Sequence, residues 1–218
     1  MPTMPEPVKR SAYDNAARQA QSRVTRQRIL GAARALMLER GYRATTISEI
    51  ARRAGVHLDT VYELVGRKPV LMRELIEQSI SGTDQAVVAE EREYVRAMQA
   101  EPDPARKLKI YAHAIREVQA RMAPLFVALR DAGTTDPDAH EVWRQISDRR
   151  AANMRKLVRD LRQAGGLRPG LSIADAADTI WATNSPELYV LLTAEREWTA
   201  DHYETWLAET WCRLLLPD

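Results

Sequence analysis

The sequence predicts an all-helical fold, with a small N-terminal three-helix unit followed by a larger helical bundle. Strand patterns are nearly absent, whereas apolar residues recur at helical spacing from about residue 22 to the end. Helix start signals also recur, because a proline follows a capping side chain at Asp103-Pro104, Asp136-Pro137 and Ser185-Pro186. Proline at a first helical position gives up only an amide hydrogen that is unpaired there anyway. We expect nine or ten helices.

Helix boundaries can be placed from caps and glycines. The first helix is expected to bury Ile29, Ala33, Leu36 and Met37 and to end at Gly41. A long helix of roughly 40 Å is expected from about Pro137 to Gly165-Gly166. Further caps are expected at Thr83, Ser172 and Thr199.

Composition excludes several classes of protein. A chain of 218 residues with 45% hydrophobic and 28% charged residues can bury a core and is not wholly disordered. It has no long uncharged apolar run of the kind that spans a membrane, and residues 1–10 lack the apolar stretch of a secretory signal. The single cysteine, Cys212, makes no internal disulfide and suits a reducing compartment. We therefore expect a soluble, cytoplasmic protein.

Charge is distributed unevenly along the chain. Residues 1–81 carry 14 Lys and Arg against 8 Asp and Glu, whereas residues 82–218 carry 18 against 22. The densest excess is in residues 9–28, with Lys9, Arg10, Arg18, Arg23, Arg26 and Arg28 against Asp14. Such a segment attracts nucleic acid or an anionic membrane, or serves only as a solubilising tail. We expect residues 1–21 to form a mobile basic arm.

Residues 45–68, TTISEIARRAGVHLDTVYELVGRK, carry the clearest functional pattern. Thr46 and Glu49 have the spacing of a capping box, so a short helix is expected to begin at Ile47. Its buried face is expected to be Ile47, Ile50, Ala51 and Ala54, with Gly55 in the turn, Val56 at the angle, and Val61 and Leu64 buried by a second helix. The pattern predicts a helix-turn-helix whose second helix enters the major groove of DNA, or else an ordinary helical hairpin.

The same residues resemble a known family. The first helix ends in Arg40-Gly41-Tyr42, and Thr45-Thr46-Ile47, Ile50-Ala51, Ala54-Gly55-Val56, Thr60-Val61-Tyr62 and Lys68 follow. Residues 22–75 resemble the DNA-binding domain of the TetR (tetracycline-repressor-like) transcriptional regulators. The resemblance implies a DNA-binding domain at 22–82 and an effector-binding and dimerisation domain at 83–218. It also implies a homodimer that binds a roughly palindromic operator and is released or modulated by a small molecule.

The resemblance also implies roles for individual residues. DNA contacts are expected at Arg43, Thr45, Thr46, His57, Leu58, Asp59, Thr60, Tyr62 and Lys68. Thr46, Tyr62 and Lys68 would bind phosphate, whereas residues 57–60 would face base edges. The family often has serine where His57 stands and aromatic residues near Leu64 and Val65. Asp59 either accepts a hydrogen bond from a cytosine amine or is only a charge favoured by the helix dipole.

The second domain is less informative. An apolar or amphipathic effector is expected within residues 104–193, with few ionic anchors. The candidate pocket residues are His113, Met122, Phe126, Trp143, Met154, Trp181, Asn184 and Tyr189, each of which could equally belong to the core or an interface.

The last two helical segments, 172–194 and 199–216, are expected to pair in a homodimer through residues 172–216. They carry Ile173, Ala176, Ala177 and Ile180, and Trp206, Leu207, Trp211 and Leu214, at helical spacing. Core packing within one chain produces the same pattern.

Catalytic motifs are missing from the sequence. The histidines His57, His113, His140 and His202 lack metal-ligand spacing, and no nucleophile elbow or phosphate-binding glycine loop occurs. We expect no enzyme, cofactor or metal, and no membrane partner. The alternative to a DNA-binding repressor is a helical interaction or ligand-carrier protein whose basic arm binds another partner.

Overall fold

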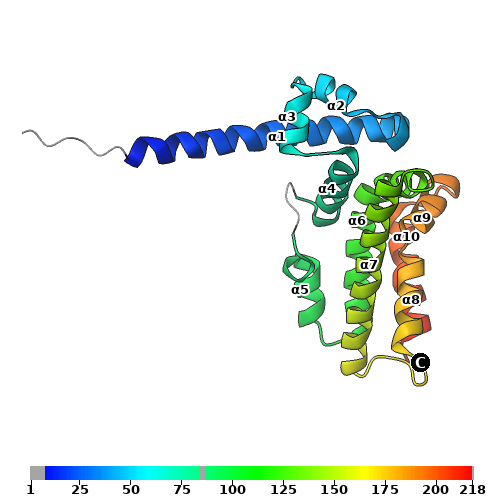
Figure 1. Cartoon of the computed structure of the whole chain (residues 1–218). Helices are drawn as coiled ribbons and strands as arrows, with labels where there is room; N and C mark the ends of the chain where they lie inside the picture. The colour runs from blue at the N-terminus through cyan, green and yellow to red at the C-terminus, as the bar shows by residue number, and fades with distance from the viewer. Residues whose placement is uncertain (1–7, 84–86, 218) are drawn as a thin grey trace, which may run out of the picture. The chain divides into compact units, whose positions relative to one another are not determined.

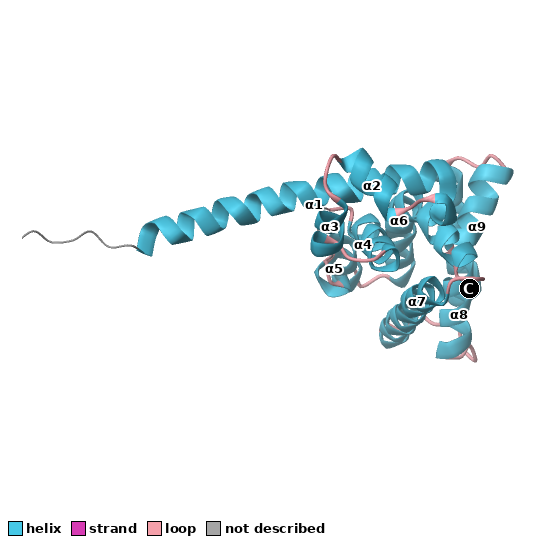
Figure 2. Ribbon diagram, turned by 45° about the horizontal axis from the view of Figure 1, so that its top comes forward, coloured by secondary structure: helices cyan, strands magenta, loops and turns pink. Residues whose placement is uncertain are grey.

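The structure, a computed structural model, describes residues 8–83 and 87–217, and for residues 8–14 and 16 only the backbone (Figure 1). All regular elements in these ranges are helical (Figure 2), which confirms the predicted all-α class. Contacts divide the chain into two units, Met1–Leu71 and Met72–Asp218. The division falls inside α4 (Lys68–Ser81), whereas the sequence placed the boundary after residue 82.

The first unit, here called the head, contains α1 (Val8–Ala44), α2 (Ile47–Ala54), α3 (Leu58–Leu64) and the start of α4. The regular part of α1 ends at Gly41 as expected, since this residue has φ +80°, a conformation that glycine adopts without steric cost. Residues 8–21, expected as a mobile arm, are helical and continuous with the rest of α1. Residues 1–7 of that arm lie outside the described residues.

The head core forms where the apolar periodicity predicted it. The expected face of α1 is buried, namely Ile29, Ala33, Leu36 and Met37. α2 contributes Ile50, Ala51 and Ala54, and α3 contributes Val61, whereas Ile47 and Leu64 are only partly buried. Small residues on α2 allow α1 and α3 to pack closely against it, which leaves the outer sides of α2 and α3 exposed.

The second unit contains the rest of α4 and the remaining helices. These are the 3₁₀ turn η1 (Ala89–Glu91), α5 (Glu93–Ala100), α6 (Pro104–Ala132), α7 (Pro137–Gln163), α8 (Ile173–Thr183), α9 (Pro186–Val190), the π-helical turn η2 (Leu191–Glu195) and α10 (Ala200–Leu215). The five expected caps at Asp103, Asp136, Ser172, Ser185 and Thr199 each accept a hydrogen bond from a backbone amide.

The cap expected at Thr83 would bind amides of residues 84–86, which lie outside the described residues. The Thr83 amide and hydroxyl contact the Ser81 hydroxyl. The segment expected as one helix over 172–194 is interrupted at Asn184, because Ser185 and Pro186 start α9 there.

α6 is central to the second unit, where it packs against α5, α7, α9 and α10, and α7 packs against α8 (Figure 1). The core includes Leu108, Tyr111, Val158, Tyr203 and Trp211. None of the helices in the described ranges has the length and apolar character needed to span a membrane.

The residues expected at the dimer interface fall into two groups, one buried within a single chain and one more exposed. Ala176, Ala177, Ile180, Leu207 and Trp211 are at most 1% exposed within one chain, so core packing explains their periodicity. These five side chains cannot contact a partner. Ile173, Trp206 and Leu214 lie further out, and Leu214 is 46% exposed.

Candidate nucleic-acid interface and ligand cavity

The N-terminus of α2 is closed by the capping box that the sequence predicted. Thr46 Oγ1 accepts a hydrogen bond from the Glu49 amide at 3.2 Å, and the Glu49 carboxylate accepts from the Thr46 amide at 3.0 Å and its hydroxyl at 2.9 Å. These hydrogen bonds from Thr46 hold the pKa of Glu49 below its ordinary value. Thr46 is exposed, but a phosphate at this position would compete with the Glu49 carboxylate for its hydroxyl and amide.

Thr45 requires a correction. Its side chain is completely buried, and its hydroxyl donates to the Gly41 carbonyl at 2.9 Å. The hydroxyl therefore stabilises the turn after α1 and cannot reach a duplex. Arg43, two residues earlier, is exposed.

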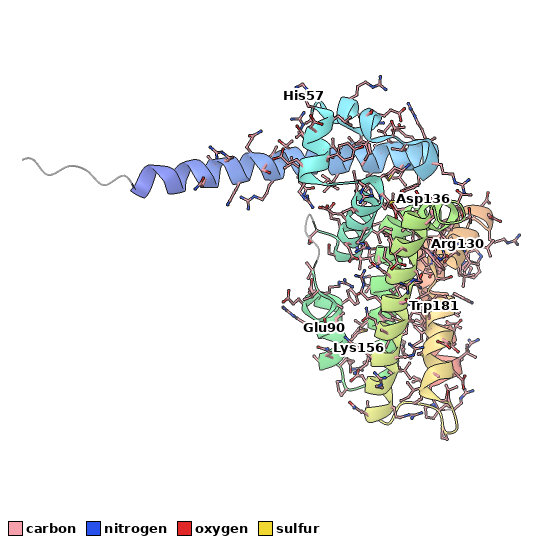
Figure 3. All side chains as sticks on the ribbon, viewed as in Figure 1. His57, Glu90, Arg130, Asp136, Lys156 and Trp181 are labelled. Atoms are coloured by element: carbon pink, nitrogen blue, oxygen red, sulfur yellow. The ribbon has the colours of Figure 1, made fainter. Side chains whose placement is uncertain are left out.

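The leading end of α3 faces outward. His57 is the N-cap residue of α3 and makes no side-chain cap hydrogen bond, and Figure 3 shows it at the tip of the head, on the side away from α1. Leu58 is 41% exposed, Asp59 is exposed, and Thr60 is partly buried, whereas Val61 is directed into the core. The four residues expected to face bases thus lie together at one accessible helix end.

Tyr62 and Asp59 of α3 carry a phenol and a carboxylate that bear on DNA binding. Tyr62 is 48% exposed, as a phosphate-binding phenol would have to be. Asp59 stands in the first turn of α3, where the helix dipole favours a carboxylate, which fits the simpler of its two interpretations.

Cations inside the head close helix C-termini. The Arg26 guanidinium donates to the carbonyl of Leu64 at the end of α3, and Arg28 donates to the carbonyl of Ala54 at the end of α2, at 2.5 Å. Cations at helix C-termini pair with unsatisfied carbonyls and with the negative end of the dipole. Part of the basic excess in residues 9–28 therefore stabilises the head itself.

Lys68 likewise donates to backbone carbonyls at the end of a helix. Its ammonium donates to the carbonyls of Tyr42 and Thr45, both at 3.1 Å, and lies 4.2 Å from the centre of the Tyr42 ring. It thus joins the start of α4 to the end of α1. A phosphate contact by Lys68 would add to this structural role and not replace it.

The second unit contains a cavity of about 220 Å³. It lies among η1, α5, α6 and α7, and its wall is mostly apolar, with Val95, Met98, Ile115 and Val118 among the residues that line it. Among the eight pocket candidates from the sequence, Met122, Met154 and Asn184 line this cavity.

The other five candidates do not line the cavity. His113 is exposed and its Nδ1 lies 3.1 Å from the Glu204 carboxylate, Tyr189 packs edge-on against the Tyr203 ring, and Trp143 lies beside His140. Phe126 and Trp181 instead flank the guanidinium of Arg150, with ring centres at 5.8 and 5.4 Å.

Arg150 and Asn184 join α7 to the junction of α8 and α9. Arg150 Nη2 donates to Asn184 Oδ1 at 2.8 Å and to the Asn184 carbonyl at 3.2 Å. Asn184 Nδ2 donates to the Tyr111 hydroxyl at 3.1 Å. All three side chains line the cavity, so it has one polar end.

The sequence did not predict Arg150, Tyr111 and Gln119 as residues of the cavity wall. For Arg150, the helical spacing of its neighbours indicates a buried position. Arg150 lies four residues from both Ile146 and Met154, so it belongs to the buried face of α7. The expectation of few ionic anchors was wrong for this reason, because a charged residue at a core position is itself informative.

Comparisons with known proteins agree with this geometry. The sequence model described as bacterial regulatory proteins of the tetR family matches residues 29–64, which span the end of α1, α2 and α3. Over residues 29–64 the chain is thus similar to the tetR family of bacterial regulatory proteins. No curated protein sequence matches the chain.

Solved structures of TetR-like architecture match nearly the whole chain. The fatty acid degradation regulator FadR from Bacillus halodurans has a TM-score of 0.70 at 17% identity and covers 86% of this chain and 94% of its own. NalD of Pseudomonas aeruginosa, the secondary repressor of the MexAB-OprM multidrug efflux pump, has a TM-score of 0.70 at 22% identity and covers 91% and 99%. FadR from Bacillus subtilis, in complex with stearoyl-CoA, has a TM-score of 0.66 at 18% identity and covers 85% and 97%.

The family match covers the helix-turn-helix of the head, and the solved structures share the all-helical fold of the chain. Within the described residues, no three His, Cys, Asp or Glu side chains approach closely enough to hold a metal ion.

Proposed function

We propose that this chain is a homodimeric, cytoplasmic repressor of the TetR family that binds a roughly palindromic operator and is modulated by a small molecule. The observation that carries the proposal is the accessible leading end of α3, where His57, Leu58 and Asp59 stand outside a buried Ile50–Ala51–Val61 core. A short helix held in this way presents its N-terminal side chains to base edges in the major groove. An ordinary helical hairpin in a bundle core would cover this face.

Ligand response is supported by the cavity in the second unit. A ligand lowers operator affinity only as far as it prefers the DNA-incompetent conformation over the DNA-bound one. The stearoyl-CoA complex of the Bacillus subtilis regulator gives one case of an amphipathic ligand in this fold. The cavity here, at about 220 Å³, is suited to a much smaller amphipathic molecule.

Dimerisation is proposed through the outer faces of α8 and α10. The residues available there are those that the core leaves exposed or partly exposed, such as Ile173, Trp206 and Leu214. A two-fold dimer places two α3 helices on successive major-groove faces, about 34 Å apart or a multiple of it, so operator half-sites are inverted repeats.

Selection of bound sequences from a random duplex pool tests the proposal. We expect an enriched inverted repeat whose affinity falls with increasing salt, because phosphate contacts release counterions. If the pool yields no enriched sequence at any salt concentration, the chain is instead an interaction or ligand-carrier protein whose basic segment binds another partner.

A further inference from the structure

The cavity in the second unit has an excess of positive charge. Its wall contains four cationic and two anionic side chains, which are Arg92, Arg149, Arg150, Lys156, Glu90 and Asp160. This excess indicates an anion site only if some of the cations lack a partner, because a cation paired with a carboxylate is already neutralised within the protein.

Three ion pairs neutralise most of these groups. Lys156 pairs with Glu90 at 2.8 Å, across the facing elements α7 and η1 (Figure 3). Arg149 pairs with Glu77 of α4, and Asp160 pairs with the buried Lys107 of α6. Two cavity cations, Arg92 and Arg150, form no ion pair with any carboxylate in the part of the chain that the structure describes.

Arg150 is the more strongly constrained of these two cations. Its Nη2 group donates to the carbonyls of Trp181 and Asn184 and to the Asn184 side chain. The rings of Phe126 and Trp181 flank its guanidinium, and burial lowers its pKa below the ordinary value. Arginine nevertheless stays protonated in proteins, so a fixed cation remains at the polar end of the cavity.

An acceptor beside Arg150 also lacks a partner. Gln119 is 1% exposed, and its Nε2 donates to the same Asn184 carbonyl that accepts from Arg150. That contact fixes the orientation of the amide, since only its nitrogen can donate to a carbonyl. Gln119 Oε1 is consequently buried without a hydrogen-bond donor, although Gln119 lines the cavity.

We infer that the cavity binds a small organic acid whose carboxylate pairs with Arg150, whose apolar body contacts the Met98, Ile115, Val118 and Met122 side chains, and whose neighbouring hydroxyl donates to Gln119 Oε1. The inference rests on the proposed function of this cavity as the effector site. The Nη2 group of Arg150 already donates to protein oxygens, so its Nη1 and Nε groups are the ones that can donate charge-assisted hydrogen bonds to a carboxylate. A buried unpaired acceptor likewise favours a ligand that supplies a donor.

The cavity volume limits the size of this acid. A cavity of about 220 Å³ accommodates a ligand with on the order of ten non-hydrogen atoms. Octanoate is a suitable probe, octanamide is its neutral counterpart of the same shape, and 3-hydroxyoctanoate adds the donor for Gln119.

The test is isothermal titration calorimetry of the full chain with the three probes. We expect octanoate to bind roughly 10- to 100-fold more tightly than octanamide, and 3-hydroxyoctanoate to bind more tightly than octanoate. Arg150→Met should remove the preference for the acid. Arg155→Met is the matched control, because Arg155 is an exposed arginine of the same helix and does not line the cavity.

Gln119→Glu keeps the inference falsifiable should Arg150→Met fail to fold. It places a carboxylate of the same size beside Arg150, so octanoate binding should fall at least about tenfold while octanamide binding is retained. Equal affinity of the wild-type chain for octanoate and octanamide, or no binding of either acid, overturns the inference.

Operator titrations separate this inference from the proposed function. Acid binding that depends on Arg150 but leaves operator affinity unchanged supports the anion site and contradicts ligand-responsive repression. Release of the operator by octanamide, with no preference for octanoate, supports the repressor and overturns the anion site.

Discussion

Lys68, Arg26 and Arg28 act in the head chiefly on backbone carbonyls. Each lies at the C-terminal end of a helix other than its own, where carbonyls lack intrahelical donors. The positive charge of the first 81 residues therefore serves both to stabilise the head and, under the proposed function, to attract DNA. Net charge alone does not distinguish these two roles. Exposed arginines such as Arg18, Arg43 and Arg52 remain as candidates for attraction to DNA.

Lys68→Met tests the structural use. It keeps an unbranched apolar side chain and removes the donors to Tyr42 and Thr45, so the free energy of unfolding should fall by about 1–3 kcal/mol in urea denaturation. Arg18→Met removes an exposed charge on α1 and should change it by less than about 0.5 kcal/mol. Equal effects of the two substitutions would contradict the structural role.

The same variant separates structure from phosphate binding. A fall of about 1 in the slope of log K against log salt would add Lys68 to the phosphate contacts. An unchanged slope in the folded variant would show that Lys68 binds no phosphate and contacts only carbonyls of the head.

The turn between α2 and α3 determines how α3 is presented. Gly55 ends α2 with φ +64°, and its amide donates to carbonyls of the last turn of α2. A Cβ at this position would lie 3.0 Å from Arg28 Nη2, the group that donates to the Ala54 carbonyl. The left-handed backbone conformation therefore favours glycine, and a Cβ would also displace the Arg28 guanidinium slightly.

Gly55→Ala should destabilise the head by about 1–2 kcal/mol, because an L-residue in the left-handed region is strained. Gly31→Ala is the control, since Gly31 lies inside α1 and an added Cβ meets nothing within 4 Å. It should stabilise the chain by roughly 0.5–1 kcal/mol through helix propensity. Thermal denaturation of both variants makes the comparison, and a neutral Gly55→Ala would contradict this account of the turn.

Capping residues and apolar periodicity predicted where helices begin and end. They predicted less well which residues those helices contact in the folded chain. The caps at Asp103, Asp136 and Ser172 follow from side chains that bond to nearby amides, so sequence neighbours determine them. The burial of Ala176 and Trp211 inside one chain, and the hydrogen bond of Thr45 to Gly41, depend on tertiary packing. Periodicity identifies an apolar face and cannot distinguish a core from an interface.

At the scale of the whole molecule, the proposed function requires a dimer, because a two-fold operator is read by two α3 helices. Leu214→Glu places a charge on the proposed α10 interface and should give a monomer by light scattering at micromolar concentration. Val88→Glu is the matched control, because Val88 is 58% exposed and lies outside residues 172–216, so its variant should stay dimeric. A dimeric Leu214→Glu chain with unchanged operator affinity would contradict this interface.

The central claim is that the leading end of α3 reads bases while exposed cations of the head bind the backbone. Fluorescence anisotropy with the selected operator and a scrambled duplex, at several salt concentrations, tests it most directly. We predict that His57→Ala weakens binding to the operator alone by roughly 1–3 kcal/mol. Arg43→Ala should weaken both duplexes and lower the salt slope by about 1. Equal binding of both duplexes by the wild-type chain, or an equal loss on both caused by His57→Ala, would contradict the claim.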